Sequence, residues 1–236
     1  PVAVSAIDIA PGNVVLANLT PATGGTTTFD LYFQARVQAL LGSDSKPVYT
    51  PGGVNPELTV VAAFHGSLNG VGQATLLPGA PNYLTVYSDP SNNSNDLAGT
   101  GFSDGTPILS TVATSGWGVV AALPSSVLLD QFGPDNYSGL TAFMTLGAVD
   151  FTASVNSFNA NYLINGGDIT SLAVQSVLGS PFTSVNPSAQ LFDLSNNPIT
   201  GMQLQSDGNA TFTTVPEPAS LGLLGLGALA LLRRKR

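Results

Sequence analysis

Alternation of apolar and polar residues constrains the fold of this chain more than any other feature of its sequence. Residues 27–38 show it best, because every second side chain there is apolar: Phe29, Leu31, Phe33, Ala35 and Val37. A period of two places these side chains on one face of a strand. Residues 149–156 repeat the pattern. Both segments are therefore predicted to be strands with one buried face.

Shorter segments of the same kind are separated by turn-forming residues. We expect strands at residues 14–19, 58–64, 83–87, 118–123 and 190–194, and a hairpin over residues 202–213 with an Asp-Gly turn at 206–209. Residues 169–178 fit a short helix nearly as well as a strand. The sequence thus predicts an all-β fold, a single antiparallel β-sandwich or jelly-roll-like domain at 1–214, followed by a short C-terminal hydrophobic helix.

Charged residues are scarce and unevenly placed. Only 8% of the residues are charged, and four of the six basic ones end the chain: Arg233, Arg234, Lys235 and Arg236. Residues 1–232 hold two basic residues against fourteen acidic ones, which gives them a net charge of −12. Phosphate backbones would repel such a body, because nucleic-acid binding needs lysine and arginine. We therefore expect no nucleic-acid partner.

The last 22 residues combine a spacer, an apolar run and a basic end. The spacer is stiff because each of its prolines fixes φ and removes an N–H donor; it consists of Val215, Pro216, Glu217 and Pro218. Residues 221–232 are apolar and precede the basic cluster. As a helix they would span a bilayer only marginally, with the basic cluster on the cytoplasmic side. Residues 215–236 are therefore interpreted as a processed C-terminal signal, with a permanent tail anchor as the alternative.

This tail resembles the PEP-CTERM sorting signal of Gram-negative bacteria. The resemblance implies processing by an exosortase in the inner membrane during export, usually in organisms that also make exopolysaccharide. It implies a protein that is anchored in the inner membrane through its C-terminal helix and then placed at the cell surface or in the extracellular matrix. Because exported proteins are made with a signal peptide, we expect Pro1 to lie near a removed leader.

Residues that could carry catalysis are few. The chain has one histidine, His65, and no cysteine. Zinc sites therefore lose their usual ligands, and a Ser–His triad has a single possible base. We expect His65 to be a surface imidazole at a strand. A hydrolase of matrix polymers would need two carboxylates about 5–10 Å apart in one groove, and no pair stands out. We predict that the protein is not an enzyme.

Oxygen-bearing side chains gather in residues 89–105. Four of them are candidate Ca²⁺ ligands, because Ca²⁺ prefers hard oxygen donors: Asp89, Asn93, Asn95 and Asp96. The competing interpretation is a surface loop whose Asn and Asp side chains stabilise turns. No other cofactor is expected. Trp117 lies between two glycines and is interpreted either as a sugar-stacking platform or as part of the core rim.

Four segments of the body resemble the flocculation-associated PEP-CTERM protein family: residues 87–91, 95–109, 130–133 and 185–190. The resemblance implies a secreted protein that bacterial cells need to aggregate in exopolysaccharide flocs and biofilm. The first functional hypothesis is thus a non-enzymatic matrix protein with extracellular polysaccharide as its partner. The alternative is a lectin-like carbohydrate-binding module, with Ca²⁺ at the loop near Asp89.

Overall fold

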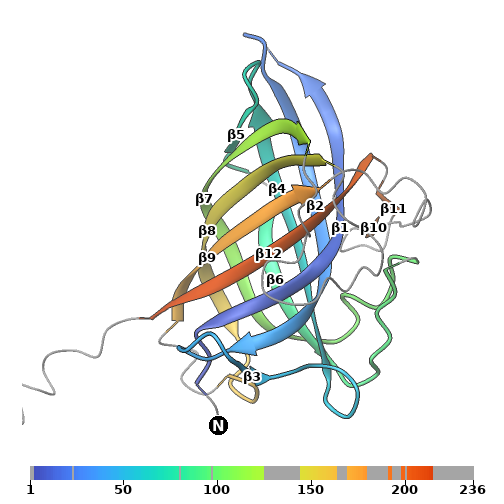
Figure 1. The fold of residues 1–236 in the computed structure, drawn as a ribbon, viewed down its shortest axis with the longest axis vertical. Helices are drawn as coiled ribbons and strands as arrows, with labels where there is room; N and C mark the ends of the chain where they lie inside the picture. The colour runs from blue at the N-terminus through green and yellow to red at the C-terminus, as the bar shows by residue number, and fades with distance from the viewer. Residues whose placement is uncertain are drawn as a thin grey trace, which may run out of the picture.

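The computed structural model describes residues 3–22, 24–79, 81–96, 98–124, 144–163, 169–179, 191–192, 198–199 and 201–214. In these ranges the regular structure is β-strand, and ten strands form one antiparallel sheet (Figure 1). The predicted all-β antiparallel fold is confirmed. The predicted hydrophobic helix at residues 221–232 lies outside the described ranges. Inside them, no helix has the length and apolarity needed to cross a membrane.

The chain contributes its strands in this order: β1 (Ala6–Pro21), β2 (Thr27–Leu41), β3 (Pro47–Tyr49), β4 (Glu57–Leu68), β5 (Gln73–Leu76), β6 (Asn82–Asp89), β7 (Thr106–Pro124), β8 (Met144–Phe158), β9 (Ile169–Gly179), β10 (Leu191–Phe192), β11 (Pro198–Ile199) and β12 (Met202–Thr214).

The large sheet closes on itself. β1 pairs with β2 on one side and with β12 on the other, and the pairing continues through β4, β6, β7, β8 and β9 back to β12. β5 shares the position of β6, because both pair with β4 and β7. The strands therefore surround a common interior as a closed cylinder, rather than forming the two facing sheets of a sandwich (Figure 1).

Inward-pointing side chains fill the cylinder. The alternating apolar residues of β2 and β4 belong to the buried core, together with residues from the other strands. The rings of Phe64 and Phe151 meet there with their centroids 4.3 Å apart. The described residues line apolar cavities of about 30 and 50 Å³. Such volumes hold no more than a few water molecules, so the interior is a packed core, as small eight-stranded closed sheets usually are.

The hairpin predicted over residues 202–213 is wrong, because these residues form the single strand β12. Asp207 and Gly208 pair with Val177 and Ser176 of β9. An Asp-Gly hairpin turn requires positive φ, and Gly208 does not have it. Instead, Gly208 supplies a small residue in a strand, where a Cβ atom would lie 3.3 Å from the Gln175 carbonyl oxygen. The ambiguous segment at residues 169–178 is strand β9.

Candidate functional site

The connection between β6 and β7, residues 90–105, folds over the outside of the sheet. We call it the β6–β7 loop. Its Phe102 is buried against Val61 of β4 and Tyr87 of β6. The Phe102 carbonyl oxygen accepts a hydrogen bond of 2.7 Å from Thr59 Oγ1. The loop therefore buries outward-facing side chains of β4, which is why residues 57–64 are buried on both faces of that strand.

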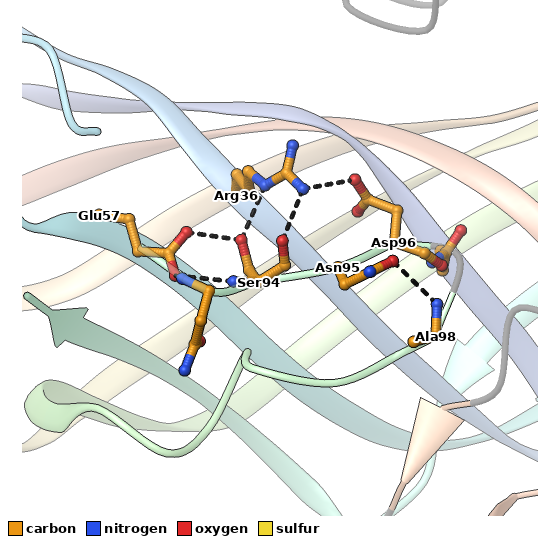
Figure 2. Close-up of polar contacts among 8 residues, drawn as sticks. Arg36, Glu57, Ser94, Asn95, Asp96 and Ala98 are labelled. Atoms are coloured by element: carbon orange, nitrogen blue, oxygen red, sulfur yellow. Dashed lines mark hydrogen bonds and ion pairs between the residues drawn. The ribbon is translucent and has the colours of Figure 1, made fainter. Parts of the chain in front are cut away.

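Glu57, the first residue of β4, holds this loop in place. Its carboxylate is buried and accepts three hydrogen bonds (Figure 2). Oε1 accepts from the backbone N–H groups of Asn93 at 2.7 Å and Ser94 at 2.9 Å, and Oε2 accepts from Ser94 Oγ at 2.5 Å. Hydrogen bonds to an ionised acceptor are about twice as strong as neutral ones. One side chain thus fixes the direction of the backbone at two successive loop residues.

Arg36 of β2 contacts the same loop from the neighbouring strand (Figure 2). Its Nε donates to Ser94 Oγ at 2.7 Å, and its Nη2 donates to the Ser94 carbonyl oxygen at 2.9 Å. Nη2 also forms an ion pair of 3.0 Å with Asp96 Oδ2. Asn13 Nδ2 of β1 donates to the Asp96 carbonyl oxygen at 2.9 Å. Polar contacts therefore tie the loop to β1, β2 and β4.

The surroundings of Asp96 shift the pKa of its carboxyl group in opposite directions. Burial raises its pKa above the ordinary value and is the dominant effect. The nearby Arg36 guanidinium lowers the pKa, and the negative charge of Glu57 raises it. The balance leaves the pKa raised. Ionised Asp96 is therefore tolerated at this position rather than strongly favoured.

The four predicted Ca²⁺ ligands lie in or next to this loop, and each has a partner within the protein. Asp96 pairs with Arg36. The other three contacts are Asp89 Oδ1 with Ser91 N at 2.8 Å, Asn93 Nδ2 with Asp104 Oδ2 at 3.1 Å, and Asn95 Oδ1 with Ala98 N at 3.0 Å. In the described ranges no group of three or more His, Cys, Asp or Glu side chains is placed to hold a metal. Calcium binding stays a prediction.

One atom near these residues lacks a hydrogen-bond partner. Asp89 Oδ2 is buried and accepts no hydrogen bond from the described residues. Asp89 also lies directly opposite Glu57 in the β4–β6 register. A buried oxygen of this kind is satisfied by a water molecule or a cation. This atom, at the end of β6 where the loop begins, is the feature of the region that best fits a small polar ligand.

His65 lies on the outer face of β4, opposite Asp30 of β2. Its Nδ1 is 2.7 Å from Asp30 Oδ1, and Asp30 Oδ2 accepts a hydrogen bond of 2.7 Å from Asn18 Nδ2. In the part of the chain that the structure describes, no serine or threonine hydroxyl forms a hydrogen bond with this imidazole. The geometry here provides an oriented imidazole without a paired nucleophile.

Trp117 is on the outside of β7, where its side chain is 59% exposed. It stands directly opposite Thr75 of β5 and Asp150 of β8. The structure therefore supports the exposed position that sugar stacking would require, rather than a place in the core.

No sequence motif points to Glu57 or Arg36, although they organise the loop. For Arg36 a signal existed, because it is one of only two basic residues before the tail. In an acidic body, a lone cation is expected to pair with carboxylates. For Glu57 the sequence offers no comparable signal, because its role depends on a loop that begins more than thirty residues later.

Comparisons with known proteins identify the tail. Residues 214–236 match the PEP-CTERM protein-sorting motif, whereas no curated protein and no solved structure matches the chain. The predicted PEP-CTERM motif is therefore confirmed; its spacer at 215–218 and basic cluster at 233–236 lie outside the described ranges. The first matched residue, Thr214, is the last residue of β12 and pairs with Ile169. The motif implies export to the cell surface or extracellular space and processing by exosortase at the membrane.

Proposed function

We propose that this protein is a non-enzymatic component of the extracellular matrix of a Gram-negative bacterium, where it supports exopolysaccharide-associated cell aggregation in flocs and biofilm. Residues 1–214 would be the extracellular domain, and residues 215–236 the sorting signal. The apolar helix would hold the protein in the inner membrane until exosortase acts, and extracellular polysaccharide would be its lasting partner.

The observation that carries this proposal is the sorting motif at residues 214–236. The character of the body agrees with it. Its interior is a packed core, in which the described residues line small apolar cavities of about 30 and 50 Å³. Charged residues make up only 8% of the chain, so the polar groups of its surface are largely hydroxyl and amide groups. Such groups can exchange hydrogen bonds with water for hydrogen bonds with sugars at little desolvation cost.

The test is removal of residues 215–236 in the producing cells. We expect the shortened protein to be retained or lost, and aggregation to be abolished; re-expression of the full chain should restore both. Mass spectrometry of the mature C-terminus then locates the processing site. Normal flocs from cells that carry only the shortened protein would contradict the proposal.

The alternative is a discrete lectin-like module that binds carbohydrate through Ca²⁺ at the β6–β7 loop. Asp89 Oδ2 favours it, because this oxygen is buried and has no hydrogen-bond partner among the described residues. Calorimetric titration with CaCl₂ should then show saturable binding that Asp89→Asn weakens, while Asp44→Asn, an exposed carboxylate beside Lys46, leaves binding unchanged. Glycan binding that EDTA does not alter would eliminate this alternative.

A further inference from the structure

A row of outward-pointing side chains crosses the sheet at Trp117. The strand register places Thr75 of β5, Trp117 of β7, Asp150 of β8 and Gln175 of β9 directly opposite one another in sequence. We call these four residues the Trp117 row. Their chain neighbours Ala74, Phe151 and Val174 are buried and point the other way, toward the core. Directly opposed side chains on neighbouring strands have Cβ atoms about 5 Å apart.

The polar members of the row are available to a ligand. Thr75 and Gln175 are exposed, and Asp150 is half-buried. In the described part of the chain, none of their side chains is engaged in a hydrogen bond or an ion pair. They contrast with Glu57 and Arg36, whose polar atoms are taken up by the β6–β7 loop. The row therefore combines one exposed ring with a carboxylate, an amide and a hydroxyl that have no side-chain partner among the described residues.

This combination matches the two surfaces of a pyranose. The C–H groups on a sugar's face pack against an aromatic ring, while its hydroxyls lie around the rim and bind polar side chains. A carboxylate accepts two hydroxyl hydrogens, and an amide both donates and accepts. An isolated exposed apolar residue would need no explanation. Here the ring stands between Thr75 and Asp150, with Gln175 one strand further on.

The charge of the Trp117 row indicates which class of glycan it can bind. The Trp117 row contains one carboxylate and no cation. The two basic residues of the described body lie elsewhere and are paired, Arg36 with Asp96 and Lys46 with Asp44. An anionic polymer would therefore meet Asp150 with nothing to balance its charge. We propose that the Trp117 row is a binding platform for a neutral polysaccharide; this inference rests on the proposed function, because it names the partner polymer.

The experiment uses the full chain in mild detergent and exploits the fact that Trp117 is its only tryptophan. Soluble neutral polysaccharides (a β-glucan and a mannan) are titrated while tryptophan emission and acrylamide quenching are followed. We expect a saturable blue shift and protection from quenching with at least one of them, and no change with alginate. Affinity electrophoresis in gels containing the same polymer provides an affinity that does not depend on the tryptophan.

In those gels Trp117→Ala should weaken binding at least tenfold. Trp117→Phe, which keeps an aromatic face, should remain within about threefold of the original chain, and Asp150→Ala should lose several-fold. The matched control is Tyr162→Ala, because Tyr162 is 48% exposed but lies outside the row; it should bind normally. Circular dichroism establishes that each variant is folded.

Three outcomes would overturn the inference. Equal binding by the original chain and Trp117→Ala would show that the glycan binds elsewhere, and would leave the proposed function standing. Binding of alginate alone would show that the charge argument is wrong. Self-association that Trp117→Ala abolishes, without any glycan binding, would make a second copy the occupant. The proposed function is tested by a different experiment, the aggregation of cells whose protein lacks residues 215–236. Its failure can therefore be told apart from failure of the inference about the Trp117 row.

Discussion

Replacing Glu57 with alanine should detach the β6–β7 loop from the sheet. The buried carboxylate accepts hydrogen bonds from two backbone N–H groups and one hydroxyl, at 2.7, 2.9 and 2.5 Å. In the alanine variant, the N–H groups of Asn93 and Ser94 lose their acceptor. Arg36 would then be the remaining side chain that binds Ser94. The loop would lose its attachment to β4 at this end while keeping the contact of Phe102 with Val61 and Tyr87.

The size of the effect follows from those contacts. Each partly buried donor left without an acceptor costs about 1–3 kcal/mol, partly offset by removal of the buried Glu57 charge. We expect Glu57→Ala to lower the free energy of unfolding by about 3 kcal/mol. Glu57→Gln keeps one carbonyl oxygen for the two N–H groups but loses the charge. It should cost about 1.5 kcal/mol, because charge-assisted hydrogen bonds are about twice as strong as neutral ones.

Urea unfolding monitored by Trp117 emission gives the global value, and hydrogen exchange gives the local one. A change of about 3 kcal/mol corresponds to exchange about a hundredfold faster at the Asn93 and Ser94 amides. Asp44→Ala is the control, because Asp44 is exposed and contacts only Lys46 nearby; it should change stability by less than about 0.5 kcal/mol. Unchanged protection of both amides in Glu57→Ala would refute the reasoning.

Two further predictions concern packing and pH. Gly12→Ala should lower the free energy of unfolding in urea by about 3 kcal/mol, because the new Cβ would lie 2.4 Å from both Ala35 Cβ and the Gln34 carbonyl oxygen. Gly70→Ala is the control and should be neutral, because the nearest atom to its new Cβ is 3.7 Å away. Equal losses of stability in the two variants would contradict the prediction. Burial raises the pKa of Asp96 in the folded protein above its value in the unfolded chain. The contribution of Asp96 to stability therefore falls as the pH rises through the interval between these two pKa values. The stability of Asp96→Asn relative to the original chain should therefore increase between pH 3.5 and pH 7; a difference that stays constant or falls would show otherwise.

The strands were predictable where one face is buried and the other is solvated. β2 is the clearest case, because its apolar residues alternate from Phe29 to Val37 and point into the core. The Asp-Gly pair at 207–208 misled for a physical reason. The same dipeptide that favours a turn also supplies a small residue inside a packed cylinder, and only the neighbouring strands decide between these roles.

Closure of the sheet and the architecture of the loop depend on contacts distant in sequence. Pairing of β1 with β12 joins residues about two hundred positions apart, and no local pattern encodes that partnership. The candidate site shows the same limit. The oxygen-rich residues from Asp89 to Asp96 were recognisable as a group, but their hydrogen-bond partners include Glu57 and Arg36 from two other strands. Trp117 is exposed because it lies on the outer face of β7. The two glycines beside it do not indicate which face of the strand it occupies.

The position of β12 places the closing strand of the sheet directly before the sorting motif. This strand fills the gap between β9 and β1, and the sorting motif starts at its final residue, Thr214. A chain that stops before residue 202 would lack both the closing strand and the tail that exosortase reads. A truncated translation product whose sheet cannot close would therefore also lack the sorting motif.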